Sequence, residues 1–253
     1  MTPRLRPAHA PARVAVKAAA LALVAFAGCI ESAQQPLDYD AVAVAQGGGR
    51  ATIDGWSVTL SRADVALGPF YFCAASSGSS TLCPSSVGEV TRVSVVDALA
   101  AAPSPIGVVH GYSGRVQSAS YDFGITWFDT QTAATPAVGL PGGHSMRLEG
   151  VARKGSTVFA LTADVDVIPQ YQGQEAISTA PASADVESTA TRLEVVLDPA
   201  AWLRQLDFDA MAANVAATGD VAFAIEPGTP EHAAILVGIK NLAPPELRWV
   251  AAP

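Results

Sequence analysis

The sequence predicts an all-β fold, an antiparallel β-sandwich with two short helices near the C-terminal half. Short runs rich in Val, Ile, Thr and aromatic residues recur along the chain, each bounded by Gly, Pro, Asp or Ser. Only two segments carry helix start signals, whereas a parallel α/β sheet needs a helix after most strands. Half of the 253 residues are apolar and 15% are charged, which is enough for one buried core.

The first strand signal starts at residue 55, where Trp56, Val58 and Leu60 alternate on one face before a second run over residues 66–73. The clearest hairpin has its reversal at Arg153-Lys154-Gly155-Ser156, between runs at residues 146–152 and 157–167. The other expected strands lie at residues 89–99, 118–128, 190–198, 219–226 and 246–250.

Helix signals occur at two places in the C-terminal half. Asp198 can cap a first turn that has Pro199 at its first position, where the missing N–H costs nothing. Thr229 and Pro230 repeat the device, and that helix is expected to end near Asn241. Both helices should be short.

Three segments are expected along the chain: a signal peptide at 1–28, a lipidated cysteine with a flexible linker at 29–50, and one β-sandwich domain at 51–253. The linker contains a run of three glycines, 47–49. Residues 173–190, rich in Ser, Ala and acids, are expected to form a long solvated loop.

The first 28 residues have the charge order of a secretory signal peptide. Four basic residues and no acid precede an apolar run at 18–27, which is too short to span a bilayer. Ala27 and Gly28 then precede Cys29 in a pattern that resembles the bacterial lipobox, whose cysteine is lipidated after cleavage. The alternative is a plain signal peptide that leaves Cys29 free.

Lipid on Cys29 predicts a protein of the bacterial cell envelope, facing the periplasm and anchored in a membrane by its acyl chains. Ile30 follows the cysteine where an inner-membrane retention signal has aspartate, so the outer membrane is favoured. The whole chain carries a formal charge of −8, and removal of the four basic residues in the first 28 leaves −12. An acidic surface of this kind disfavours nucleic acid as a partner.

Two further cysteines, Cys73 and Cys83, bracket a loop of small residues. In an oxidising compartment this pair predicts a disulfide that pins a hairpin loop. The alternative is a two-thiolate metal site, for which no partners lie nearby in the sequence.

His110 and His144 follow glycine-rich breaks that a sandwich could bring together at one end. Imidazole is the commonest ligand for zinc and copper, so these two histidines, joined by a carboxylate or a third histidine, are the candidate metal ligands. The alternative is that both are unliganded loop histidines. His232, in the first turn of the second helix, is expected to be a surface residue.

Other candidate sites carry weaker signals. Two pairs of aspartates, Asp164 with Asp166 and Asp207 with Asp209, could bind calcium but fit a solvated strand face better. Ser113, in a glycine-rich stretch, invites comparison with a hydrolase nucleophile, but a strand and not a helix is expected after it. No catalytic residue or organic cofactor is therefore assigned.

The segments GWSVTLSRADVALG, DPAAWLRQLDF and PEHAAILVGI, together with the lipobox, resemble the layout of MbnP-like envelope β-sandwich lipoproteins. This resemblance implies a role in copper handling, and some members of the family bind copper through histidines and a modified tryptophan. No ligand residue is carried over to this chain.

These observations favour a non-enzymatic, lipid-anchored envelope protein that binds a ligand or a metal ion, copper or zinc, through His110 and His144. An interaction module for another envelope protein is the second hypothesis. A hydrolase that uses Ser113 is the third.

Overall fold

The computed structural model describes residues 34–76, 86–187 and 191–251. Residues 36–253 form one compact unit. The expected signal peptide, Cys29 and Cys83 lie outside the described residues. No helix among the described residues is long and apolar enough to cross a membrane.

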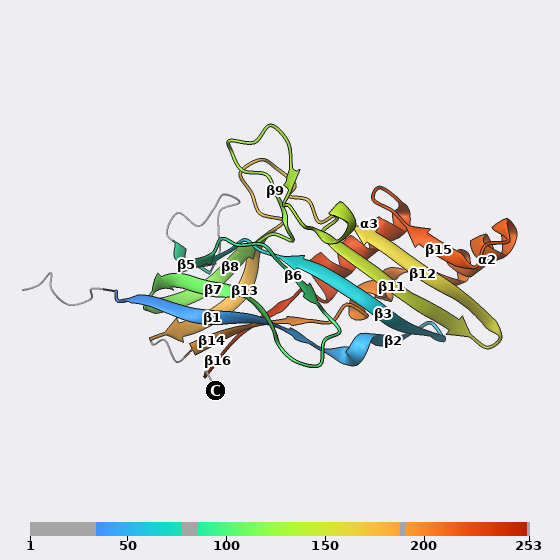
Figure 1. Ribbon diagram of the computed structural model, residues 1–253, viewed down its shortest axis with the longest axis horizontal. Helices are drawn as coiled ribbons and strands as arrows, with labels where there is room; N and C mark the ends of the chain where they lie inside the picture. Colours follow the sequence, from blue (N-terminus) through green and yellow to red (C-terminus); the bar gives the residue numbers. More distant parts are fainter. Residues whose placement is uncertain (1–33, 77–85, 188–190, 252–253) are drawn as a thin grey trace, which may run out of the picture. The chain divides into compact units, whose positions relative to one another are not determined.

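The fold is all-β, as predicted, and consists of two large sheets and one small one (Figure 1). Across the eight-stranded sheet the order is β13 (Ile177–Val186), β8 (Gly114–Tyr121), β4 (Phe70–Cys73), β5 (Ser86–Val90), β7 (Ser104–Tyr112), β1 (Pro36–Ala45), β14 (Thr191–Leu197) and β16 (Glu246–Ala251). The six-stranded sheet contains β15 (Ala222–Ile225), β12 (Thr157–Val165), β11 (Met146–Lys154), β3 (Trp56–Leu67), β2 (Arg50–Ile53) and β6 (Ser94–Asp97). The small sheet pairs β9 (Ile125–Thr126) with β10 (Thr135–Pro136).

Most strand pairs are antiparallel, and two are parallel: β1 with β14, and β12 with β15. The predicted hairpin is confirmed, since β11 and β12 pair along their whole length up to Lys154 opposite Thr157. The predicted face of β3 is also confirmed, because Trp56, Val58 and Leu60 are all buried.

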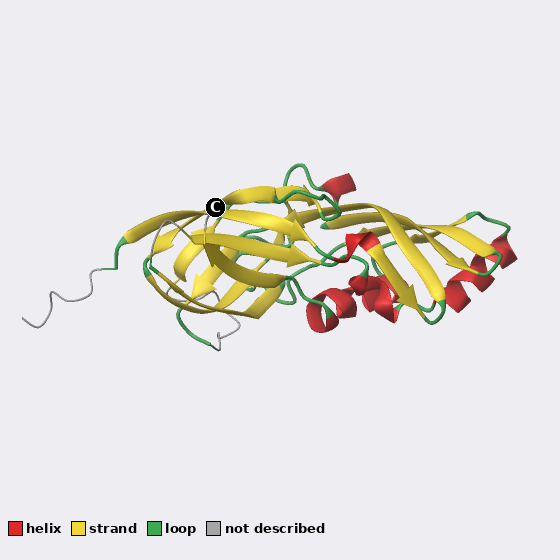
Figure 2. Ribbon diagram, turned by 90° about the horizontal axis from the view of Figure 1, so that it is seen from below, coloured by secondary structure: helices red, strands yellow, loops and turns green. Residues whose placement is uncertain are grey.

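The helices pack against the six-stranded sheet (Figure 2). The motif at Asp198 gives only a short 3-10 helix, η4 (Ala201–Gln205), and the longer α2 (Phe208–Thr218) follows it with Asp207 as its cap. The second predicted helix is confirmed as α3 (Pro230–Val237), capped by Thr229 and continued by the π-helix η5 (Gly238–Leu242). Two further short turns are η2 (Gly47–Gly49) and η3 (Pro141–Gly143).

Two segments were wrongly predicted to be irregular. Residues 36–45, placed in the flexible linker, form β1 in the interior of the eight-stranded sheet, where Leu37, Tyr39, Ala41 and Ala43 are buried in alternation. Residues 177–186, placed in the solvated loop, form β13 at the edge of the same sheet. Two inward side chains of each strand are alanines, Ala41 and Ala43 in β1 and Ala180 and Ala182 in β13. Alanine buries little apolar area, so it gives a weak hydrophobic pattern.

A single core joins the two large sheets. It contains Phe70 and Phe72 of β4, Leu161 of β12, and Trp202 of η4, all fully buried. The chain crosses from the six-stranded to the eight-stranded sheet between β3 and β4, at Gly68. A side chain there would meet the carbonyl oxygen of Arg92 at 2.4 Å, so glycine is required for this close approach.

Candidate functional site

His110 lies on β7, in the middle of a row of polar residues that crosses three strands. Its partner on β1 is Asp38, and its partner on β5 is Glu89. Residues directly opposite each other in antiparallel strands have neighbouring side chains on the same face. The register therefore brings an imidazole between two carboxylates from three separate parts of the sequence.

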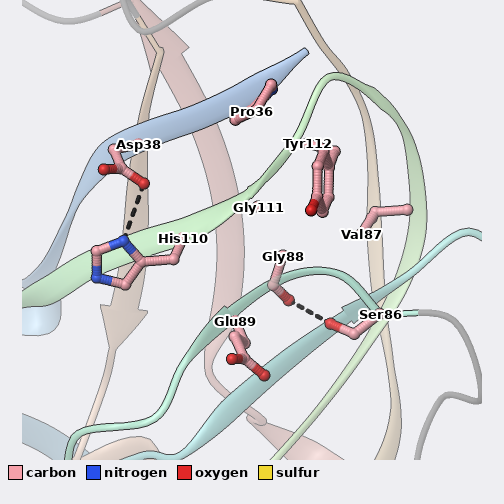
Figure 3. Close-up of a pocket in the computed structure, with 9 residues that line it drawn as sticks. All are labelled: Pro36, Asp38, Ser86, Val87, Gly88, Glu89, His110, Gly111 and Tyr112. Carbon is pink, nitrogen blue, oxygen red and sulfur yellow. Dashed lines mark hydrogen bonds and ion pairs between the residues drawn. The ribbon is translucent and has the colours of Figure 1, made fainter. Parts of the chain in front are cut away.

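This row borders a hollow of about 450 Å³ on the surface of the eight-stranded sheet (Figure 3). Nδ1 of His110 lies 2.9 Å from Oδ1 of Asp38, and Glu89 stands on the other side of His110. Tyr112 and Pro36, which are opposite each other on β7 and β1, continue the hollow beside Val87. The nine lining residues include no lysine or arginine, so the hollow is acidic.

The His110–Asp38 pair is exposed to solvent, with side-chain exposures of 65% and 68%. An ion pair this exposed is screened by water and holds the imidazole only weakly. The hollow therefore gives His110 a defined neighbourhood but not a rigid orientation.

His144 lies at the end of η3, just before β11 in the six-stranded sheet. Its Nδ1 is 3.0 Å from Oδ1 of Asp166, and its Nε2 is 4.0 Å from Oδ2 of Asp164. The side-chain exposures of His144, Asp164 and Asp166 are 28%, 33% and 19%, so this group is much less exposed than the His110 pair. The Asp164 and Asp166 pair is thus part of a histidine cluster and not a plain solvated strand face.

A second histidine lies behind this cluster. His232, expected on the surface, is only 7% exposed, and its Nε2 accepts a hydrogen bond from the backbone N–H of Asp166 at 3.1 Å. Burial lowers the pKa of His232, which favours the neutral imidazole that this acceptor role requires. The error arose because α3 turns its first residues toward β12, which the capping motif does not reveal.

Arg147 provides positive charge beside His144. Its Nε lies 3.2 Å from Oε1 of Glu149 and 4.0 Å from Oδ1 of Asp164. Glu149 is also held by Arg62, at 3.0 Å. Arg147 is therefore closer to Glu149 than to Asp164, which leaves the charge of Asp164 only partly compensated.

The structure does not bring His110 and His144 together on one carboxylate. His110 lies on the eight-stranded sheet, whereas His144 lies in the turn before β11, and their acidic partners differ: Asp38 for the first and Asp166 for the second. Among the described residues no group of three or more His, Cys, Asp or Glu is arranged to hold a metal ion. Any metal bound at either histidine would need solvent or a ligand to complete its coordination.

The remaining candidates have structural roles or lie partly outside the described chain. Asp207 caps α2, and Asp209 accepts hydrogen bonds from Lys154 and from Nε1 of Trp56. The hydrogen bond from Lys154, followed by the one from Trp56, lowers the pKa of Asp209. Ser113 lies in the turn between β7 and β8, so a strand follows it, as expected. The Cys73–Cys83 disulfide stays a prediction, because Cys83 is not described.

Sequence reasoning missed a buried acidic pair where β8 ends. Asp122 is 1% exposed and Glu175 is 6% exposed. Burial raises the pKa of both carboxyls, and that of Asp122 reaches about 8. Lys240, on η5, has its own pKa lowered by burial. No sequence motif marks this group, because the three residues come from segments that are distant in the chain.

Comparisons with known proteins identify no family for this chain. No protein-family model and no curated protein matches it. This chain is similar to a solved structure, MbnP from Methylosinus trichosporium, at 12% sequence identity and a TM-score of 0.32. The aligned region spans 68% of this chain and 78% of the MbnP chain. This is a weak structural resemblance, and the function has to be argued from the residues of the chain itself.

Proposed function

We propose that this chain is a non-enzymatic binding protein of the bacterial cell envelope that is anchored in the outer membrane by lipid on Cys29. In this proposal it binds a divalent transition-metal ion, zinc or copper, through His144 and Asp164. The observation that carries the proposal is the position of His144, whose two ring nitrogens each face a carboxylate.

Asp166 suits the role of an orienting partner. A metal-binding histidine commonly donates its second ring N–H to a carboxylate, which fixes the ring and raises its basicity as a ligand. The 3.0 Å contact from Nδ1 to Asp166 has this form and leaves Nε2 available to a metal. His110 has a similar contact to Asp38, but both of those side chains are about two-thirds exposed, so ordering them costs more conformational entropy.

Asp164 suits the role of a second ligand. In a tetrahedral zinc site with bonds near 2.1 Å, ligand atoms lie about 3.4 Å apart. Nε2 of His144 and Oδ2 of Asp164 are 4.0 Å apart, so a small rotation of the carboxylate closes the difference. Because the protein supplies two ligands, water or a small molecule would occupy the other positions.

The local charge also favours a cation. Asp164, Asp166 and Glu149 lie in this region, and Arg147 is engaged chiefly by Glu149. The neutral form of the buried His232 adds no positive charge. The surroundings of Nε2 therefore carry a net negative charge, which stabilises a bound divalent ion.

Metal binding is tested by calorimetric titration of the protein with zinc and, separately, with copper. We expect His144→Asn to weaken binding by at least tenfold, and Asp166→Asn by roughly tenfold through loss of ring orientation. His110→Asn is the matched control and should leave the affinity unchanged. Failure of the unmodified protein to bind either metal, or an equal loss in the His110 variant, would exclude this site.

The anchor is tested independently by growing cells that express the full chain with labelled palmitate. Label on the protein that disappears in Cys29→Ser supports lipidation, and fractionation of the envelope then identifies the membrane. A protein that is exported without label would retain the proposed metal site but lose the proposed anchor.

A further inference from the structure

The hollow beside His110 has polar and apolar side chains in its lining, and it is separate from the metal site proposed at His144. Its lining has a polar row across β1, β7 and β5 and, beside it, an apolar row that starts with the pair Pro36 and Tyr112 on β1 and β7. The polar row contains Asp38, His110 and Glu89. The apolar row beside it contains Pro36 and Tyr112, which are exposed, and Val87, which is only 9% exposed and contributes the floor of the hollow (Figure 3). An acidic line therefore runs directly alongside an apolar line.

The polar row presents its negative charge at two separated points. Adjacent strands lie about 4.8 Å apart, so the backbones of Asp38 and Glu89, two strands apart, are about 10 Å from each other. His110 stands between them and is engaged by Asp38 through Nδ1. Glu89 forms no ion pair with any lysine or arginine in the described part of the chain. The row therefore offers one carboxylate near each end.

The apolar row supplies a surface for a hydrocarbon chain. Tyr112 is 51% exposed, and its ring stands beside Val87 (Figure 3). An alkyl chain laid along this row would bury apolar area, and an ammonium group close to the ring face would gain a cation–π contact. Arg92 lines a neighbouring hollow on the other side of His110 and opposes this attraction at that end.

We propose that this groove binds linear aliphatic diamines, with one ammonium group on Asp38, the other on Glu89 and the hydrocarbon chain against Tyr112. The lining contains acidic, aromatic and aliphatic side chains and no cation, which matches a molecule that is cationic at both ends and apolar between them. This site is separate from the metal site proposed at His144, and neither proposal depends on the other.

The test is a calorimetric titration of the full chain in detergent with cadaverine, and with pentylamine as the probe that lacks one ammonium group. We expect cadaverine to bind at least fivefold more tightly, because the second ion pair is made only by the diamine. Asp38→Asn and Glu89→Gln should each weaken cadaverine binding by about fivefold and leave pentylamine less affected. Salt should reduce the difference between the two amines.

His144→Asn is the control for this experiment and should bind cadaverine like the unmodified protein. Tyr112→Leu keeps the carboxylates and removes the aromatic ring, so it should weaken both amines together. Equal affinity for the two amines, undetectable binding of cadaverine, or full binding by the Asp38→Asn and Glu89→Gln variants would overturn the proposal. Asp38, Glu89 and Tyr112 all line the surface hollow, and an unchanged unfolding temperature checks that each variant is folded.

Discussion

Replacing Asp122 by asparagine offers a direct measurement of what a buried ionisable group costs this fold. Asp122 is 1% exposed, and its Oδ1 accepts a hydrogen bond from the backbone N–H of Ala176 at 2.7 Å. Burial raises its pKa from 3.8 to about 8, and the neighbouring Glu175 adds to the rise. The Ala176 hydrogen bond and the charge of Lys240 act in the opposite direction but do not outweigh burial.

The sign of the pH dependence follows from this shift. Between pH 3.8 and 8 the folded state holds a proton on Asp122 that the unfolded state has released, so the free energy of unfolding falls as pH rises. The loss is about 1.4 kcal/mol for each pH unit. From pH 6.5 to pH 8 the loss amounts to about 1.6 kcal/mol, because Asp122 is itself half ionised near pH 8. Histidine in the unfolded chain has a pKa of about 6.5, so only the upper half of its titration lies in this window.

Asp122→Asn removes the titration and keeps an oxygen that can accept the Ala176 hydrogen bond. We therefore expect the variant to lose most of the pH dependence between pH 6.5 and 8, and to be more stable than the unmodified protein at pH 8. Urea unfolding followed by tryptophan fluorescence at several pH values measures both effects. Asp40→Asn, on the exposed side of β1, is the surface control.

A free energy of unfolding that stays level or rises between pH 6.5 and 8 in the unmodified protein would refute the reasoning. The same slope in the Asp122→Asn variant would also refute it, since the proton would then be bound elsewhere. Glu175→Gln tests the neighbour of Asp122: it removes a carboxylate whose charge raises the pKa of Asp122, so it should reduce the slope.

Four other substitutions test how the fold positions its helices and the His144 cluster. Asp207→Ala and Thr229→Ala should each cost about 1 kcal/mol of unfolding free energy, because each removes the side-chain cap of a helix, and urea unfolding at neutral pH measures the loss. Gly238→Ala should lower the free energy of unfolding by about 3 kcal/mol, because the new Cβ would meet the carbonyl oxygen of Trp202 at 2.2 Å. Gly219→Ser, at an exposed glycine, is the control. A smaller loss in Gly238→Ala than in this control would contradict the packing of η5. Burial lowers the pKa of His232 below its unfolded value of 6.5, so the free energy of unfolding should fall as pH drops below 6.5. In His232→Gln this fall should be smaller. The same fall in the variant and in the unmodified protein would contradict a buried, neutral His232.

Much of the fold could be predicted because large side chains alternate clearly. In β3, Trp56, Val58 and Leu60 identify the buried face, and the turn at Gly155 fixes the β11–β12 hairpin. Two strands that escaped prediction, β1 and β13, include small inward residues, such as Ala41 in β1 and Ala180 in β13. Alanine fits a strand interior only when neighbouring strands already cover it, and that condition is set by the tertiary structure.

The part of the candidate site around His144 could be predicted, because its position depends on the β11–β12 hairpin alone. A register that places Lys154 opposite Thr157 also places Met146 opposite Val165. His144 precedes Met146 and Asp166 follows Val165, so the turn alone brings these two residues to the same end of the hairpin. The His110 row could not be found this way, because it joins β7 to β1, and neither of these segments was predicted to be a strand. His232 was missed for a similar reason, since its burial depends on how α3 docks against the end of β12.

The two sequence-predicted histidines have the same kind of carboxylate contact at Nδ1, and their surroundings differ in a way that separates their chemistry. The His144 group is mostly shielded from water, so its geometry is held in advance and a small ion can bind through few protein atoms. The His110 pair is about two-thirds exposed, so each charged contact there contributes little by itself. A ligand at His110 must therefore gain affinity from several weak contacts at once, and the apolar row beside it provides the surface on which an extended ligand can do so.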